Sequence, residues 1–421
     1  MKIIMSGRTE PREVIKNMLW YIIALANLVK DVVLKYKNMC LVAVALTGAP
    51  SARNKRAFLV QLVKMIQKLE VINFRNFAHK LIKFPASTTV IAGPNASGKT
   101  NLLESIHLLS TGKSFRAERE FEMINYDQEI ARIKARVGEK EESEVLEVVL
   151  TTGQLTAGAK LKVAPRKKLL VDGVGKRLMD FAGRFPSVLF SPQDMDLVTS
   201  SPSVRRQFFN AVLTQTDREY RRSFLAYEKG IKRRNRLLFA IREGAANRNQ
   251  LTYWDMLLIK NGDTITRLRQ ELVEYINRQS GLSNREFELQ YSKNLVTEER
   301  LNKYAEAEVA AAQTLVGPHR DDFVFMVKNG SSSKFRELAR FGSRGEARLA
   351  VLWLKLSEFA FIADKTHKEP TLLLDDILSE LDEVRREAVL EVVAKHQTII
   401  TTAEDISELN LSNVEKISLG G

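Results

Sequence analysis

A glycine-rich segment with one lysine, residues 93–100, has the residue types that bind a nucleoside triphosphate. It matches every fixed position of the pattern G-x-x-x-x-G-K-[ST]. Glycines let backbone N–H groups face the phosphates, the lysine reaches the β- and γ-phosphates, and the threonine hydroxyl binds Mg²⁺. An apolar run before it and a helical pattern after it favour this interpretation over a chance glycine-serine turn. The predicted nucleotide-binding residues are Gly93, Pro94, Asn95, Ala96, Ser97, Gly98, Lys99 and Thr100.

Two adjacent carboxylates follow a buried apolar run at residues 371–374. At the carboxyl end of a parallel strand, Asp375 would meet the Mg²⁺ held by Thr100. Asp376 would orient or deprotonate an attacking water, so Asp376 and Lys99 are the predicted catalytic residues. An apolar strand ending in acids is weak evidence alone, and the phosphate loop strengthens it.

A third motif, residues 343–346, reads Ser-Arg-Gly-Glu and precedes a helical pattern over 347–363. Ser343 suits the N-cap and Glu346 the third position of a capping box, so the simplest interpretation is a helix start. The order of phosphate loop, long insertion, Ser-x-Gly-Glu helix and acidic strand resembles the head of an ATP-binding-cassette (ABC) ATPase. That resemblance implies that Ser343, Gly345 and Glu346 complete the ATP site of a second subunit.

The elements that must position these motifs follow one another from Met65 onward. Alternating apolar residues predict a strand over 66–74, and short β segments over 130–171 predict an antiparallel sheet. Apolar residues at helical spacing predict helices over residues 203–279. The predicted fold is α/β: an ABC-type P-loop ATPase head with an attached antiparallel β subdomain and a helical insertion arm. Residues 65–190 and 311–421 are the two parts of the head, and 191–310 are the arm.

The charge is strongly basic, with a formal net charge of +14. Residues 1–64 hold eleven Lys and Arg against three Asp and Glu, so much of this charge lies outside the head. The predicted arm is dense in basic residues, which are usually a solvated helical face but here favour contact with a DNA backbone. The DNA-binding candidates are Arg205, Arg206, Lys232, Arg233 and Arg234.

Residues 1–64 are interpreted as an N-terminal extension from an upstream start codon. Their longest apolar run, 18–29, is shorter than the roughly 18 residues that span a bilayer, which leaves a membrane-surface helix as the alternative. Cys40 is the only cysteine, which excludes an intrachain disulfide and a cysteine metal cluster. We expect a cytoplasmic protein without stable membrane association.

Seven stretches of the chain from Met65 onward resemble the RecF family of bacterial DNA replication and repair proteins, which are related to SMC-type heads. The phosphate loop alone would specify only an NTPase, whereas Gly-Pro-His-Arg-Asp-Asp and the Asp-Asp strand are more particular. The stretches are residues 69–77, 93–116, 189–194, 201–208, 233–238, 317–322 and 372–382.

The resemblance implies a weak, DNA-associated ATPase that uses ATP and Mg²⁺ and forms an ATP-dependent homodimer. It implies binding to single-stranded and to gapped or junction DNA, RecA loading with RecO and RecR, and a role in the SOS response. Many cassette ATPases have Glu where Asp376 stands and His where Thr401 or Thr402 stands, which agrees with slow turnover. Gln193 resembles a residue of the loop that senses nucleotide in related heads.

Two other function classes compete with this interpretation. The ABC-type ATPase subunit of a membrane transporter is the main alternative, but it would keep the catalytic Glu and would not need a basic helical insertion. A stand-alone NTPase or kinase would have no use for the Ser-Arg-Gly-Glu motif.

Overall fold

The computed structural model describes residues 65–139, 142–157, 160–282, 285–329, 334–377, 386, 389–390, 392–403 and 414–419. All of them belong to one compact unit, Gln61–Gly421. The predicted extension, residues 1–64, and the turn at 379–382 within the last motif stretch lie outside the described residues. Within these ranges, no helix combines the length and the hydrophobicity needed to cross a membrane.

A parallel sheet carries the phosphate loop. Its strand order is β10-β14-β15-β3-β16, and every neighbouring pair is parallel. All residues of β10, β14 and β15 are buried, as expected for apolar strands covered on both faces. The strands are β3 (Thr88–Ala92), β10 (Ser187–Phe190), β14 (Thr371–Asp375), β15 (Thr398–Thr402) and β16 (Val414–Ser418).

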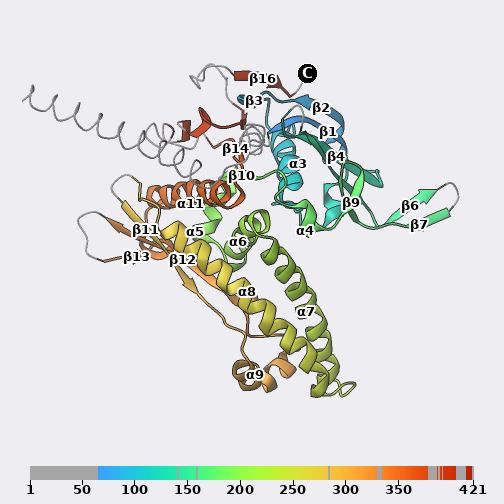
Figure 1. Cartoon of the computed structure of the whole chain (residues 1–421), viewed down its shortest axis with the longest axis vertical. Helices are drawn as coiled ribbons and strands as arrows, with labels where there is room; N and C mark the ends of the chain where they lie inside the picture. The colour runs from blue at the N-terminus through green and yellow to red at the C-terminus, as the bar shows by residue number, and fades with distance from the viewer. Residues whose placement is uncertain are drawn as a thin grey trace, which may run out of the picture. The chain divides into compact units, whose positions relative to one another are not determined.

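An antiparallel sheet faces the parallel one across helix α3 (Lys99–Thr111), and the three share one apolar core (Figure 1). Its order is β2-β1-β4-β5-β8-β9. Burial alternates residue by residue along β4, which confirms the half-buried strands predicted from period two. The strands are β1 (Ile66–Phe74), β2 (Phe77–Lys83), β4 (Ile130–Val137), β5 (Glu144–Thr151), β8 (Lys167–Val171) and β9 (Val174–Lys176), while β6 (Gln154–Ala157) and β7 (Lys160–Val163) form a separate hairpin.

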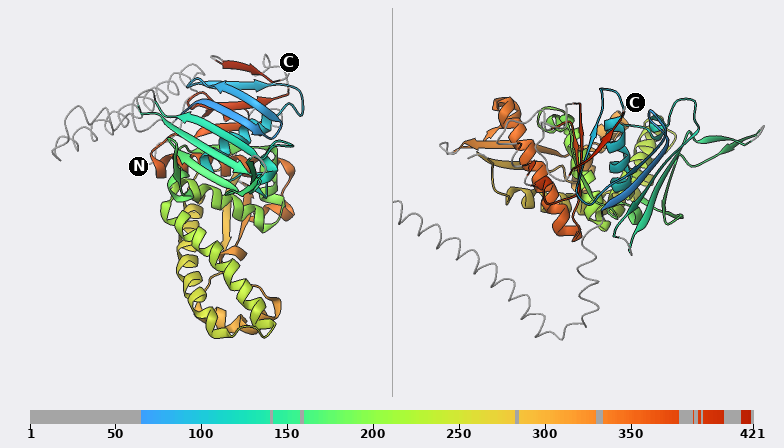
Figure 2. Two further views of the ribbon diagram at one scale, coloured as in Figure 1. Left: turned by 90° about the vertical axis from the view of Figure 1, so that its right-hand side faces the viewer. Right: turned by 90° about the horizontal axis from the view of Figure 1, so that it is seen from above.

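The helical arm is a hairpin of α7 (Arg218–Arg242) and α8 (Thr252–Asn277) that extends away from the sheets, with α9 (Glu298–Ala311) packed against both helices (Figures 1 and 2). The predicted boundary at residue 310 separates two strands that pair, because β11 (Arg285–Ser292) is antiparallel to β12 (Asp322–Asn329). The remaining elements here are α6 (Pro202–Thr216), β13 (Arg336–Glu337) and α11 (Arg344–Thr366).

Short helical segments connect these layers. They are η1 (Glu120–Met123), α4 (Leu178–Phe181), η2 (Pro192–Met195), α5 (Asp196–Thr199), η3 (Arg248–Leu251), η4 (Pro318–Arg320) and α10 (Leu338–Phe341).

Buried arginines hold the arm together. The Arg234 side chain on α7 is 3% exposed; its Nε donates to Asp255 Oδ1 at 2.6 Å and its Nη2 lies 2.7 Å from Glu308 Oε2 on α9. On α6, Arg205 makes a two-pronged pair with Asp322, at 2.7 and 3.1 Å. Both guanidinium groups are thus ion-paired to carboxylates of the same chain, which disfavours the predicted contact of Arg205 and Arg234 with DNA.

Replacing Arg234 with methionine would leave Glu308, which is fully buried, without its cation. We expect Arg234→Met to destabilise the arm by about 3–5 kcal/mol, the usual cost of breaking a buried ion pair. Native-state hydrogen exchange of the α7 and α9 amides would measure this. The control is Arg233→Gln, one residue away and exposed, which should change stability by less than about 0.5 kcal/mol. Equal exchange in the two variants would show that the buried pair does not stabilise the arm.

Candidate nucleotide site

The phosphate loop joins β3 to α3, and the helix begins at Lys99. Gly98 has φ +100°, and a Cβ there would lie 2.6 Å from atoms of Asn76 and Phe77. Only glycine fits this backbone conformation and this close approach. The turn leaves Pro94, Asn95 and Ala96 exposed and directs the first turn of α3 toward the loop. An anion in the loop would therefore face a helix N-terminus.

Lys99 spans the loop it belongs to. Its side chain is nearly buried, at 8% exposure, and its ammonium donates to the carbonyl oxygens of Gly93 at 2.7 Å and Pro94 at 2.9 Å. These contacts hold the cation at the loop, where a triphosphate would compete for it. The nucleotide-binding and catalytic role of Lys99 stays a prediction.

Asp375 and Thr100 meet at the carboxyl edge of the parallel sheet. Thr100 Oγ1 donates to Asp375 Oδ1 at 3.0 Å, although 275 residues separate them in sequence. Thr401 Oγ1 donates to the same oxygen at 2.8 Å. A carboxylate next to a threonine hydroxyl is the type of oxygen donor set that Mg²⁺ prefers. The residues fit the predicted metal.

Asp376 follows β14 in a left-handed backbone conformation, with φ +53°. Its N–H donates to Thr401 O at 3.1 Å, and it is half-buried. A non-glycine residue at positive φ stores strain, and such residues gather at functional sites. The catalytic role of Asp376 stays a prediction.

The Ser-Arg-Gly-Glu motif caps α11. Ser343 Oγ accepts from the Glu346 N–H at 3.2 Å, and Glu346 accepts from the Ser343 N–H at 2.8 Å, so the predicted capping box is confirmed. Ser343 is exposed, and because its oxygen acts as acceptor in the cap, its proton is left to donate elsewhere. Gly345 is half-buried in the first turn. Glu346 is buried and ion-paired to Arg336 at 2.6 Å, which restricts it to a supporting role.

A buried charged layer lies behind the loop that carries Gln193. Lys355 on α11 is ion-paired with Glu358, and a 420 Å³ cavity is bordered by Gln193 and this pair. Burial raises the pKa of Glu358 to about 7, although the Lys355 ammonium acts in the opposite direction. Burial also raises the pKa of Asp194, whose carboxylate accepts from the Ser191 N–H at 2.7 Å. The charges in this layer are therefore sensitive to the packing around them.

The remaining DNA candidates lie away from the phosphate loop, on the arm and at its root. Lys232 and Arg233 are exposed on α7, whereas Arg206 is half-buried on α6 and donates to Asp321 O at 2.8 Å. Arg206 and Lys232 line the same pocket.

Two residues of the site were missed by the sequence reasoning. Thr401 was noted only as a departure from histidine, but its hydroxyl binds Asp375. Asn76 donates to Ser97 O at 3.2 Å and so supports the phosphate loop from the β1–β2 turn. A polar residue at the end of a buried parallel strand was the available signal for Thr401; none singled out Asn76.

This combination of a phosphate loop, an acidic strand end, an antiparallel sheet and a serine-capped helix defines an ABC-type ATPase head. A family model described as "RecF/RecN/SMC N terminal domain" matches residues 65–417. The chain is 32% identical over 348 residues to the "DNA replication and repair protein RecF" of Lachnoclostridium phytofermentans, which covers 80% of this chain and 92% of that protein. The RecF of Oceanobacillus iheyensis is 33% identical, and the match covers 80% of this chain and 93% of that protein. The chain belongs to the RecF family.

Solved structures agree with this assignment. The "recombination mediator protein RecF-ATPrS in RecFOR pathway" has a TM-score of 0.74 at 30% identity and covers 85% of this chain and 97% of that one. The corresponding RecF-ATP structure has a TM-score of 0.73 at 28% identity, and the match covers 85% of this chain and 98% of that one. The protein is thus an ATP-binding ATPase of a DNA replication and repair family. The transporter alternative finds no support in these relatives.

Lys99→Met would remove the ammonium that the loop holds against Gly93 and Pro94. We expect ATP affinity to fall roughly tenfold to a hundredfold, because a charge-assisted hydrogen bond contributes about 1.5–3 kcal/mol. Titration calorimetry with a slowly hydrolysed ATP analogue would measure the loss. Lys113→Met, which removes a half-exposed lysine, is the matched control. Unchanged affinity in Lys99→Met would mean that the triphosphate binds elsewhere.

Proposed function

We propose that the protein is an ATP-operated DNA clamp of replication and recombinational repair, which closes as a homodimer when ATP binds and opens after slow hydrolysis. The observation that carries this proposal is the exposed Ser343 cap. It is a helix N-terminus with a hydroxyl proton still to donate, and it faces no ligand of its own chain among the described residues. A second copy carrying a triphosphate would supply the acceptor.

Mg²⁺ is the proposed cofactor, held by Thr100 and Asp375. When bound it would neutralise charge that develops on the phosphates. Within the described residues no three His, Cys, Asp or Glu side chains gather as a metal site. This agrees with an ion that takes its other oxygens from phosphate and water. Asp376 would orient the attacking water, and its short side chain supports slow turnover.

The proposed DNA surface is a basic stripe on α7: Arg222, Lys229, Arg233 and Arg236. The spacing of seven, four and three residues places them on one helix face, and all four are exposed. None has an ion-pair partner among the residues that the structure describes. We favour this stripe over the ion-paired Arg205 and Arg234 as the phosphate-contacting group. Such contacts bind strongly at low salt and read little sequence.

The relatives support the cellular context. RecF structures similar to this chain are titled as part of the RecFOR pathway. We infer that this protein acts in the cytoplasm with RecO and RecR to load RecA at gapped or junction DNA, and takes part in the SOS response.

Two substitutions at Ser343 distinguish its proposed contact with a partner's triphosphate from its role as the N-cap of α11. Ser343→Ala removes both the cap and the donor and should cost about 1 kcal/mol of stability. Ser343→Asp keeps the cap but presents a carboxylate to the partner's triphosphate, so stability should be retained and ATP-dependent dimerisation lost. Light scattering with and without ATP, beside thermal unfolding, measures both. A Ser343→Asp variant that dimerises normally with ATP would refute the trans contact.

Neutralising the basic stripe should weaken DNA binding in a salt-dependent way. With all four residues changed to Gln, the slope of log K against log salt should become about 2–4 units shallower, since each phosphate contact adds roughly 0.9. Fluorescence anisotropy across a salt series measures the slope. In the control variant, four exposed lysines outside the arm are changed to Gln in the same way: Lys160, Lys162, Lys168 and Lys176. Equal loss in both variants would show that net charge, not the stripe, binds DNA.

A further inference from the structure

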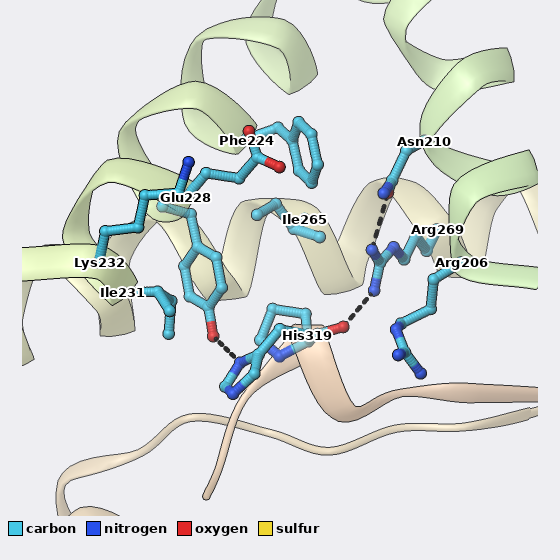
Figure 3. Close-up of a pocket in the computed structure, with 11 residues that line it drawn as sticks. Arg206, Asn210, Phe224, Glu228, Ile231, Lys232, Ile265, Arg269 and His319 are labelled. Carbon is cyan, nitrogen blue, oxygen red and sulfur yellow. Dashed lines mark hydrogen bonds between the residues drawn. The ribbon is translucent and has the colours of Figure 1, made fainter. Parts of the chain in front are cut away.

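A pocket of 260 Å³ opens at the root of the arm, apart from the nucleotide site and from the basic stripe. Figure 3 shows that its labelled walls come from α6 (Arg206), α7 (Phe224, Glu228, Ile231, Lys232) and α8 (Ile265), with His319 of η4 closing one side. These segments are far apart in sequence, so the pocket exists only in the folded arm.

The wall formed by His319 is rigid and neutral. Its Nδ1 is hydrogen-bonded to Tyr227 Oη at 2.9 Å and its Nε2 to Thr314 O at 3.0 Å. Burial lowers the pKa of His319 to about 4, so the ring carries no charge near neutral pH. Gly317, at φ +122°, lets Tyr227 approach, because a Cβ there would lie 2.1 Å from the tyrosine oxygen. This histidine shapes the pocket and has no nitrogen left for a ligand.

The cations at the pocket are unequally neutralised. Arg269, at 2% exposure, is ion-paired to Asp321 at 2.7 Å and bonded to Pro318 O and Asn210 Oδ1. Arg206 donates only to the backbone oxygen of Asp321, and neither Arg206 nor Lys232 has a carboxylate within ion-pair distance in the described part of the chain. Burial lowers the pKa of Arg206 and the nearby Arg269 acts in the same direction, while Asp321 and Asp322 act against them. Two cations on the rim therefore make no direct ion pair among the described residues, and the carboxylate of Glu228, which also lines the pocket, is paired with Lys113 instead.

The shape and chemistry of the pocket select among ligands. Its volume is below the roughly 300–1,000 Å³ of sites for drug-sized molecules, so it does not hold a whole nucleotide. A nucleobase would bury polar edges, while both ring nitrogens of His319 and the Oδ1 of Asn210 already have hydrogen-bond partners, which leaves few groups of the pocket to pair with those edges. The floor of Phe224, Ile231 and Ile265 suits an apolar side chain, and the rim suits carboxylates beside it.

We propose that this pocket binds an acidic segment of a protein partner, with one large apolar side chain inserted between α7 and α8 and flanking carboxylates on Arg206 and Lys232. The inference goes beyond the proposed clamp, since it needs neither ATP nor DNA. Such a contact would hold a partner at the root of the arm, and it leaves the exposed stripe on α7 available.

The test uses the full chain with ¹³C-labelled isoleucine methyl groups, because Ile231 and Ile265 report from inside the pocket. The probe is the capped peptide acetyl-Asp-Asp-Phe-Asp-Asp-amide at millimolar concentration. We expect both methyl signals to shift in a saturable, salt-sensitive way. Arg206→Gln and Lys232→Gln should each weaken binding severalfold, while Arg233→Gln, a neighbouring exposed cation outside the pocket, should leave it unchanged.

Three comparison ligands make the outcome decisive. The same peptide with Ala in place of Phe tests the apolar insertion, a Lys-flanked version tests the charges, and a single-stranded tetranucleotide tests nucleic acid. Absence of a shift with the Phe peptide would overturn the proposal, as would equal shifts with the Ala peptide. Shifts with the tetranucleotide alone would assign the pocket to DNA.

Discussion

Two threonine hydroxyls converge on one carboxylate oxygen, and the nucleotide site depends on that junction. Thr100 follows β3, Asp375 ends β14, and Thr401 lies on β15 directly opposite Asp375. Parallel strands bring their carboxyl ends to one edge, which is where ligands bind in α/β sheets. A one-residue slip between β14 and β15 would turn Asp375 away from the loop. The register of two buried strands therefore keeps these three side chains together, however long the insertion between them.

The arm shows a different use of charge. Its sequence is dense in arginine, but Arg205, Arg234 and Arg269 are interior residues neutralised by carboxylates from distant segments. Burying a charge without a partner is costly, so such pairs fix which segments can pack together. Arg233, the residue before Arg234, points in a different direction from the helix axis and is exposed to solvent. Helix α7 thus carries both a buried ion pair that holds the arm together and a solvent-exposed basic surface.

The local sequence pattern was sufficient to predict most helices and strands and the phosphate loop. Period-two alternation located β1, apolar runs located β14 and β15, and the serine cap located the start of α11, although the predicted helical pattern began only at residue 347. Strand β16 was missed because its exposed residues break the apolar pattern, although the Leu419 N–H that follows it donates to Ala92 O beside the loop. The faces of the basic residues could not be predicted, since Asp322 and Glu308, which bury Arg205 and Arg234, lie more than seventy residues away along the chain.

Helix α11 connects the proposed dimer contact at Ser343 with the buried charged layer behind Gln193. Its tip carries Ser343, and twelve residues further along Lys355 lies in the buried layer behind Gln193. Twelve residues of helix span about 18 Å and move as a stiff rod. The Asp194 carboxylate of the same layer interacts electrostatically with both Lys355 and Asp375, at the acidic end of β14. The proposed trans contact at Ser343 and the predicted Mg²⁺ ligand Asp375 are therefore connected through one helix and one buried charged layer.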